Sequence, residues 1–362
     1  MPPSPRPASV DTRDTEPVRG DERLDPRALD AYLRPRLPPV RGELEIEQFP
    51  GGHSNLTYLL RWGEDEYVLR RPPLGPLVPR AHDMGREHRV LDALWPVFPP
   101  APRPWHLCED PGVIGAPFYV MERRRGVVVR RALPPAWAAD EGARRALGET
   151  VVDTMVALHA VDFARAGLGA LGRPEGFMAR QVRGWAERWE RARDREVPAI
   201  ETLAAWLDAR VPAPPDPTLV HGDLKLDNMM VAADDPRRVV AVLDWEMCTT
   251  GDPLADLGTL LGYWTSEGDP YARAEHGGYV TEQPGFPTRD EIVARYAALS
   301  GRDVSRIAFY EVFARYKTAV VVQQIYIRWK RGQTRDARFA QMAPRVEALA
   351  ESALALAERS GL

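Results

Sequence analysis

One stretch of sequence constrains this chain more than any other: LVHGDLKLDNMMV at residues 219–231, followed by VVAVLDWEMC at 239–248. The first is a polar loop between two short apolar runs, and the second begins as a strand that ends at an acid. We expect Asp223 and Asn228 on the loop and Asp244 at the end of the next strand. The three side chains would then lie at the ends of adjacent strands.

These three residue types together suit phosphoryl transfer. The reaction asks for little covalent chemistry from a protein, but it needs a carboxylate to orient the attacking hydroxyl group and oxygen ligands for Mg²⁺. Asp223, Asn228 and Asp244 supply that set. Each of them alone is typical of a turn, where short polar side chains bond to the backbone. Their combination, with apolar strands on either side, favours the catalytic interpretation.

The wider motif resembles that of a known family. His221, Gly222 and Asp223, followed by Asn228, are similar to the HGDxxxxN signature of the aminoglycoside phosphotransferase and choline kinase-like family, relatives of the protein kinases. The resemblance runs from about residue 25 onward and is strongest to the acyl-CoA-dehydrogenase-associated phosphotransferases. The segments that carry it are GGHSNLTY (51–58), YVLRRPP (67–73), HGDLKLDN (221–228) and LDWEMCTTGDPLADLG (243–258).

The resemblance implies an ATP- and magnesium-dependent kinase that acts on a hydroxyl group of a small molecule. It implies Asp223 as the catalytic base, and Asn228 and Asp244 as magnesium ligands. It also implies an α+β, bilobal, protein-kinase-like fold with a small β-rich N-lobe and a larger helical C-lobe. The lobes would cover residues 25–122 and 123–362, after a tail at residues 1–24 that is polar, proline-rich and expected to be disordered.

Three other polar residues of these motifs are expected to be structural. His221 would be a structural member of the catalytic loop. Of Asp252 and Asp256, one is expected to accept hydrogen bonds from backbone amides behind Asp244, as a helix N-cap does.

The N-terminal part carries a glycine-rich turn. Alternating apolar residues predict three short strands, at residues 43–49, 56–62 and 66–71. Glycines before the second strand permit a backbone whose N–H groups point at an anion. We expect Gly52, His53, Ser54 and Asn55 to line the nucleotide phosphates; an ordinary hairpin turn is the alternative.

The third strand carries Arg70 where protein kinases place a lysine. Its guanidinium can bridge a carboxylate and a phosphate, and the expected carboxylate is Glu87, on a helix predicted at residues 83–95. A solvated arginine is the alternative. The strand at 118–122 would be the hinge between the lobes, where Met121 and Glu122 contact adenine; apolar core packing explains this strand equally well.

Composition excludes several other functions. The net charge of −4 and pI near 6.1 do not suit nucleic-acid binding. The two cysteines are too few for a disulfide framework, and no apolar stretch approaches the roughly 18 residues of a membrane span. The N-terminus lacks the apolar region of a signal peptide. We therefore expect a cytoplasmic protein that contacts neither membrane nor nucleic acid.

The phosphate acceptor is less constrained. The candidates in the helical lobe are aromatic or amide side chains, namely Trp185, Trp189, Trp264, Tyr326, Gln323 and Gln324. This set suits a partly apolar alcohol better than a polycationic aminoglycoside, whose site should be acidic. The resemblance implies hydroxyacyl-CoA-type substrates and a functional link to an acyl-CoA dehydrogenase. The alternatives are a nucleotide-binding pseudokinase, for which Arg70 is the sole support, and a scaffold for a partner dehydrogenase.

Overall fold

The computed structural model describes residues 14–50, 55–74, 82–266, 268–269, 280–334 and 337–362. These residues fall into two compact units. The first is formed by the chain up to Trp95 together with Pro102–Arg124, and the second by Pro96–Ala101 and Arg125–Leu362. The segment Pro96–Ala101 therefore belongs to the second unit, although the sequence places it inside the predicted N-lobe.

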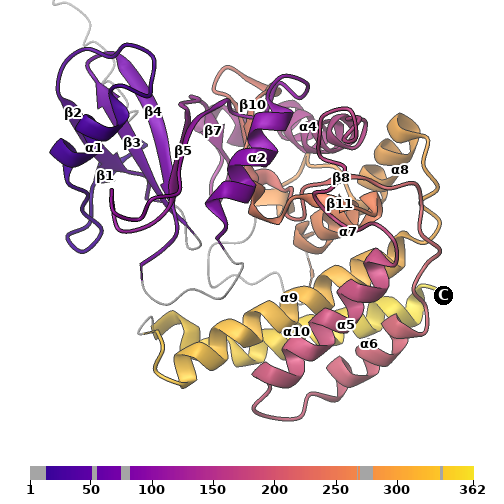
Figure 1. The fold of residues 1–362 in the computed structure, drawn as a ribbon. Helices are drawn as coiled ribbons and strands as arrows, with labels where there is room; N and C mark the ends of the chain where they lie inside the picture. Colours follow the sequence, from indigo (N-terminus) through magenta and orange to yellow (C-terminus); the bar gives the residue numbers. More distant parts are fainter. Residues whose placement is uncertain (1–13, 51–54, 75–81, 267, 270–279, 335–336) are drawn as a thin grey trace, which may run out of the picture. The chain divides into compact units, whose positions relative to one another are not determined.

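The first unit is built on a six-stranded antiparallel sheet in the order β1-β2-β3-β4-β6-β5 (Figure 1). Its strands are β1 (Glu16–Pro17), β2 (Leu44–Gln48), β3 (Leu56–Trp62), β4 (Asp65–Arg71), β5 (Pro104–Cys108) and β6 (Phe118–Glu122). Its helices are α1 (Pro26–Leu33) and α2 (Met84–Leu94). The strand β5 was not expected, because its segment follows a proline-rich passage.

Helix α1 packs on one face of this sheet. Successive side chains of a strand alternate between faces, so Tyr58, Leu60 and Trp62 of β3 share one face. All three are fully buried, in one apolar cluster with Leu29 and Leu33 of α1. This cluster is the core of the first unit.

The chain before α1 corrects one prediction. Glu16 pairs with Gln48, which adds β1 to the edge of the sheet, and the Tyr58 hydroxyl donates to the Glu22 carbonyl at 2.8 Å. An edge strand offers unpaired N–H and C=O groups, and these can order a segment that has few apolar side chains. The expected disorder of residues 1–24 is therefore wrong for residues 14–24, while residues 1–13 lie outside the described residues.

The second unit is mainly helical. Its helices are α3 (Pro135–Ala138), α4 (Glu141–His159), α5 (Phe177–Ala192), α6 (Pro198–Asp208), α7 (Pro253–Tyr263), α8 (Arg289–Ser300), α9 (Ile307–Lys330) and α10 (Ala343–Arg359). Its strands are β7 (Val127–Val128), β8 (Thr218–Val220), β9 (Met229–Ala232), β10 (Asp235–Val242) and β11 (Thr249–Gly251). They form a sheet in the order β10-β9-β7 and a pair β11-β8. Short 3₁₀ turns η1 (Leu226–Asn228) and η2 (Trp245–Met247) follow β8 and β10.

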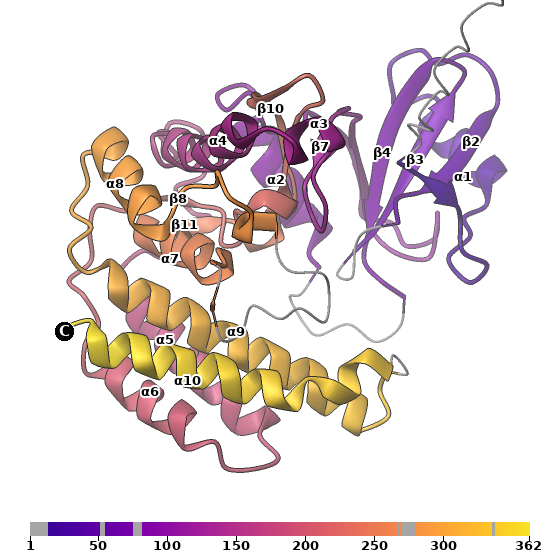
Figure 2. The same cartoon turned by 180° about the vertical axis from the view of Figure 1, so that it is seen from behind.

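Helix α9 is central to the second unit. It packs against α5, α7 and α10, and Figures 1 and 2 show α5, α6, α9 and α10 lying together. The approach of α7 is very close, since a Cβ atom on Gly258 would lie 2.6 Å from backbone atoms of Tyr310. The sheet of one unit and the helices of the other give the predicted α+β class.

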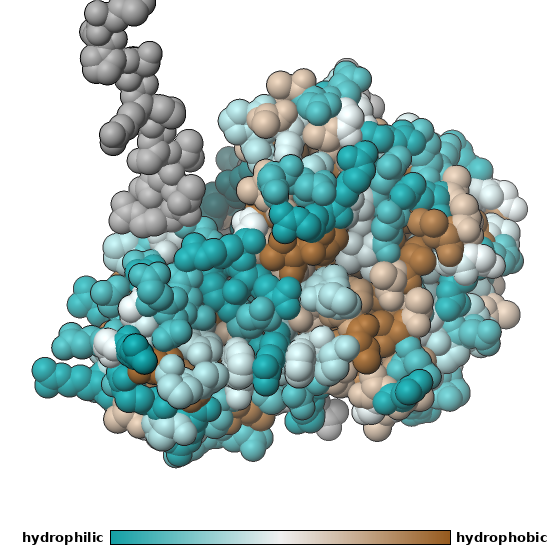
Figure 3. Space-filling view, turned by 90° about the horizontal axis from the view of Figure 1, so that it is seen from above, coloured by the Kyte–Doolittle hydropathy of each residue, from teal (hydrophilic) through white to brown (hydrophobic). Residues whose placement is uncertain are grey.

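The helices and the surface were examined for apolar regions. None of the helices in the described ranges is both long enough and apolar enough to cross a bilayer. The face shown in Figure 3 is mostly hydrophilic, with hydrophobic residues in small separate patches.

Candidate active site

The β9–β10 hairpin brings two of the predicted residues to the same end. Met229 pairs with Val242 in the antiparallel ladder, so Asn228 just before β9 and Asp244 just after β10 are neighbours in the hairpin. The Leu243 N–H donates to the Asn228 carbonyl at 2.8 Å and extends the pairing by one step. The two residues therefore emerge from adjacent strand ends, as the sequence predicts.

The loop between β8 and β9 adds Asp223 to this pair. The side-chain amide of Asn228 donates to both the carbonyl oxygen and Oδ2 of Asp223, each at 2.9 Å. The Lys225 ammonium also donates to Oδ2 of Asp223. Within the described ranges, Oδ1 of Asp223 accepts no hydrogen bond. One carboxylate oxygen is thus held in place, and the other is available to a ligand.

Sequence reasoning missed Lys225, although it lies inside the HGDLKLDN motif. Its ammonium also lies 3.4 Å from the Asp227 carboxylate and 4.9 Å from the centre of the Tyr263 ring. Burial alone would lower the pKa of Lys225, but the carboxylates of Asp223 and Asp227 outweigh it and raise that pKa. Its position two residues after Asp223 could have indicated that Lys225 lies beside that carboxylate. Lys225 therefore places a permanent positive charge beside Asp223.

Asn228 and Asp244 fit a magnesium ion chemically. Mg²⁺ prefers oxygen ligands and is often held by one or two protein side chains together with substrate phosphates. The Asn228 amide nitrogen is used by Asp223, which leaves its Oδ1 oxygen as a ligand. Asp244 adopts a left-handed backbone conformation (φ 68°, ψ 65°) that turns the chain from β10 into η2. Non-glycine residues in that conformation are uncommon and cluster at functional sites.

Asp256 of α7 anchors the loop that carries Asp223. Its carboxylate accepts hydrogen bonds from the backbone N–H groups of His221 and Gly222, each at 2.7 Å, and lies 3.3 Å from Nε2 of His159. Burial alone would raise the pKa of Asp256, but its hydrogen-bonded partners outweigh burial and lower it. Gly222 has φ +85°, and a Cβ there would lie 3.0 Å from Met247, so the turn requires glycine.

His221 is fully buried behind the loop. Its Nε2 lies 3.0 Å from the Leu243 carbonyl, its ring centre lies 4.9 Å from that of Trp245, and burial lowers the pKa of its imidazole. A neutral imidazole can donate from Nε2 to this carbonyl. The surroundings of His221 are those of a structural residue.

Asp252 and Asp256 have separate tasks. Asp252 is the N-cap of α7, where it accepts from the Leu254 N–H at 3.0 Å, and the Tyr310 hydroxyl donates to it at 2.6 Å. Asp256 holds the amides of the loop that carries Asp223. One of the two was expected to bind backbone amides; both do so.

In the first unit, the predicted ion pair of Arg70 and Glu87 is present. Nε of Arg70 lies 3.1 Å from Oε2 of Glu87, and both side chains are largely buried. Arg70 is held on β4, and Glu87 lies in the first turn of α2, which Asp83 caps. The pair fixes the orientation of the Arg70 guanidinium.

The other residues predicted to bind nucleotide belong to the glycine-rich turn and to the end of β6. Gly52, His53 and Ser54 lie outside the described residues. Asn55 is buried, with its Oδ1 2.9 Å from Nδ1 of His82. Met121 and Glu122 end β6 and are partly buried, and the Glu122 N–H donates to the Arg103 carbonyl at 2.8 Å. That donor is therefore already paired, while the Met121 side chain remains partly accessible.

Two of the predicted acceptor-site residues are structural. The Trp264 indole donates to the Pro287 carbonyl at 2.9 Å, and the Gln323 side-chain amide donates to the Ala192 carbonyl at 3.0 Å. Both residues are buried. Gln323 thus joins α9 to the end of α5, and the expectation that polarity in this apolar segment marks the substrate site does not hold for it.

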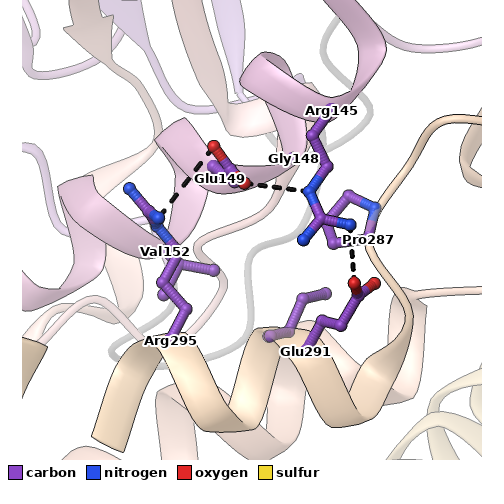
Figure 4. A pocket seen from close by; sticks show the side chains of 8 residues that line it. Arg145, Gly148, Glu149, Val152, Pro287, Glu291 and Arg295 are labelled. Atoms are coloured by element: carbon purple, nitrogen blue, oxygen red, sulfur yellow. Dashed lines mark hydrogen bonds and ion pairs between the residues drawn. The ribbon is translucent and has the colours of Figure 1, made fainter. Parts of the chain in front are cut away.

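A small cavity of about 50 Å³ lies between α4 and α8 (Figure 4). Arg145 pairs there with Glu149 at 2.9 Å and with Glu291 at 2.7 Å, and Arg295 lies 3.9 Å from Glu149. The two arginines and two glutamates that line the cavity neutralise one another. The volume of the cavity suits a few water molecules. This cavity is not a candidate substrate site.

The chain matches a family model described as "Phosphotransferase enzyme family" over residues 45–292. It is 35% identical to acyl-CoA dehydrogenase family member 11 of Rattus norvegicus, over 96% of this chain and 45% of that protein. It is 33% identical to acyl-CoA dehydrogenase family member 10 of Mus musculus, over 98% of this chain and 33% of that protein. The chain thus spans less than half the length of these curated relatives.

Solved structures of phosphotransferases are also similar to this chain. A Ralstonia eutropha protein assigned as an aminoglycoside phosphotransferase is 31% identical, with a TM-score of 0.77 over 93% of this chain and 99% of that one. A thermostable aminoglycoside phosphotransferase mutant, in complex with ADP and hygromycin B, shares the fold at 18% identity, with a TM-score of 0.57 over 90% of this chain and 98% of that one.

The chain belongs to the phosphotransferase enzyme family. The predicted kinase-like fold is confirmed, and the family description agrees with the predicted reaction class, phosphoryl transfer.

Proposed function

We propose that this protein transfers a phosphoryl group from ATP to a hydroxyl group of a small molecule. The observation that carries the proposal is the state of Asp223: Asn228 and Lys225 hold its Oδ2, and its Oδ1 accepts no hydrogen bond within the described ranges. A base must lie within hydrogen-bond reach of the proton it accepts. In the proposed reaction, Oδ1 accepts a hydrogen bond from the acceptor hydroxyl and takes its proton as the new oxygen–phosphorus bond forms.

Other residues of the two units would bind the nucleotide and its metal. Asn228 Oδ1 and the Asp244 carboxylate would hold magnesium. When bound there, magnesium would supply positive charge that offsets the negative charge of the phosphates. Arg70, oriented by Glu87, would bind a phosphate oxygen. The residues proposed for the remaining nucleotide contacts are Gly52, His53, Ser54, Asn55, Met121 and Glu122. The related kinase crystallised with ADP supports a nucleotide as donor.

For the acceptor, we propose a hydroxyacyl-CoA-type alcohol. The support is the name of the relatives, acyl-CoA dehydrogenases, whose sequences match this chain over less than half of their own length. A phosphotransferase unit in the same chain as an acyl-CoA dehydrogenase would act on a related acyl compound. A functional link between this protein and such a dehydrogenase follows from the same proposal.

The test is acceptor-dependent release of ADP from Mg-ATP, with hydroxyacyl-CoAs, aminoglycosides, choline and sugars as acceptors. Asp223→Asn should lower kcat by about 10²–10⁴ while Mg-ATP still binds, because the base is lost and the metal ligands remain. Asp244→Asn should weaken magnesium-dependent nucleotide binding. The matched control is Asp216→Asn, at an exposed loop position.

Three outcomes discriminate between the possible functions. Turnover with a hydroxyacyl-CoA, lost in Asp223→Asn, supports the full proposal. Tight Mg-ATP binding without turnover on any acceptor identifies a pseudokinase. Absence of magnesium-dependent nucleotide binding overturns both and leaves the scaffold function.

A further inference from the structure

A buried hydrogen-bond donor on α5 has no partner within the ranges that the structure describes. Trp185 is 7% exposed, and its indole Nε1 is buried with no acceptor among the residues that the structure describes. A buried donor without an acceptor is destabilising, so it calls for an explanation. The indole N–H of Trp189, one turn later, likewise finds no acceptor in the described part of the chain. Trp185 differs from it because two cations lie over its ring.

These cations are Arg188 and Lys317. Cζ of Arg188 lies 4.3 Å from the centre of the Trp185 ring, and Nζ of Lys317 lies 5.7 Å from it. Within the described part of the chain, neither side chain forms an ion pair with a carboxylate. Burial lowers the pKa of Lys317 and outweighs the carboxylates of Asp223 and Asp256, which act in the opposite direction. Two cations that share one aromatic ring, without a direct ion pair among the described residues, complement a negatively charged ligand.

The position of Lys317 connects this cluster to the catalytic loop. Its ammonium lies 3.4 Å from the carbonyl oxygen of Gly222, which immediately precedes Asp223. Trp185 and Arg188 are on α5 and Lys317 is on α9, and these helices lie side by side (Figures 1 and 2). The cluster offers an ammonium, a guanidinium and an indole N–H, all of them donors.

We propose that Lys317, Arg188 and the Trp185 indole form a recognition site for a carboxylate or phosphate group of the acceptor, so that the acceptor is an anionic alcohol. The inference rests on the proposed phosphoryl transfer and specifies its substrate class. An anionic oxygen group can accept hydrogen bonds from these donors and places a negative charge directly beside the two cations. A polycationic aminoglycoside would instead meet two like charges beside Asp223.

Binding to the full chain saturated with Mg²⁺ and AMP-PNP tests the proposal, since the nucleotide site is then occupied. Calorimetry compares 3-hydroxybutyrate with its methyl ester, and glycerol 3-phosphate with glycerol. We expect the anionic member of at least one pair to bind about tenfold more tightly or better, which is the effect of one charge-assisted hydrogen bond. The first pair tests a carboxylate and the second a phosphate. No preference in either pair overturns the proposal.

Variants assign any preference to the cluster. Lys317→Met should abolish it, Arg188→Gln and Trp185→Phe should reduce it several-fold, and Lys317→Arg should restore it. Arg183→Gln, an exposed arginine on another side of α5, is the matched control and should change nothing. If Lys317→Met fails to fold, Trp185→Phe and Arg188→Gln decide. A preference that these variants leave unchanged contradicts the proposal.

The two proposals fail in different ways. If ADP release requires a neutral or cationic alcohol and the variants do not alter its KM, the anion site is wrong and the kinase stands. If no alcohol releases ADP but the complex with AMP-PNP keeps a preference that depends on Lys317, the anion site stands and the kinase fails.

Discussion

Asp256 accepts a hydrogen bond from the backbone N–H of His221 at 2.7 Å, across 35 positions of sequence. The same carboxylate binds the next backbone N–H, that of Gly222, so helix α7 sets the conformation of the loop that carries the proposed base. A carboxylate that accepts two backbone N–H bonds in a buried position is a strong and directional anchor. The position of Asp223 thus depends on a helix outside the catalytic loop.

Asp256→Asn should therefore reduce both stability and catalysis. The amide keeps the size of the side chain but turns one of its acceptor groups into a donor, which would face a backbone N–H. We expect a loss of about 2–4 kcal/mol in the free energy of unfolding, the cost of disrupting buried hydrogen bonds to a charged group. Urea unfolding measures this loss, with Asp216→Asn as the exposed control. A fall in kcat larger than the change in Mg-ATP affinity is also expected, and an unchanged kcat would contradict the anchoring role.

Arg70→Met should destabilise the first unit. It removes the guanidinium 3.1 Å from the buried Glu87 carboxylate, and loss of one member of a buried pair costs about 3–5 kcal/mol. Arg70→Met together with Glu87→Met should recover part of this loss, because no charge then stays buried without that partner. Thermal unfolding of the single and the double variant measures how much stability is recovered. A double variant less stable than Arg70→Met would show that Glu87 is stabilised without Arg70.

The protein should become less stable as pH falls below about 6.5, the ordinary pKa of histidine. Burial lowers the pKa of His221 in the folded state, so the unfolded chain takes up the proton first. The contribution of the neutral imidazole is complete above pH 6.5 and is lost as pH falls toward the folded-state pKa. His221→Gln keeps a donor for the Leu243 carbonyl but does not titrate. As pH falls, the free energy of unfolding of His221→Gln should therefore decrease less steeply than that of the unsubstituted protein. The difference between the two slopes should be up to about 1.4 kcal/mol per pH unit. Equal slopes in the two proteins would contradict this.

Gly258→Ala should separate α7 from α9. The new methyl group would lie 2.6 Å from backbone atoms of Tyr310, which cannot move without shifting α9. Overpacking of this kind costs about 1–3 kcal/mol. Gly169→Ala is the matched control, since a Cβ there meets no atom within 4 Å. Because α7 carries Asp256 and α9 carries Lys317, the KM of the acceptor should rise in Gly258→Ala. Equal melting temperatures for the two variants would exclude the close approach.

Local signals were sufficient for much of the fold. Asp25 and Asp83 cap α1 and α2, and Thr288 with Glu291 forms the capping box of α8. Caps of this kind can be read from sequence because each is set by residues a few positions apart. The Asp223, Asn228 and Asp244 arrangement was predictable for a similar reason, since a hairpin brings its own strand ends together.

Features that depend on distant segments were not predictable. The pairing of β11 with β8 joins Thr250 to Leu219, and no local pattern identifies such partners. The anchoring role of Asp256 required knowledge of where α7 lies. Lys317 follows Arg315 and Tyr316 on α9 without forming a recognisable motif, and its proximity to the Trp185 ring becomes visible only once the positions of α5 and α9 are known. Proximity between helices, and not residue type, carries this information.

The two hydrogen bonds to Asp256 also determine how the catalytic loop can move. The amide protons of His221 and Gly222 can exchange with solvent only when that carboxylate is displaced from behind the loop, and its own partners bind it to the helical core. Local opening of a surface loop is nearly free, whereas opening of a core element approaches the global unfolding energy. This segment should therefore exchange as slowly as the helices around it, so that Asp223 is held in place before any substrate arrives.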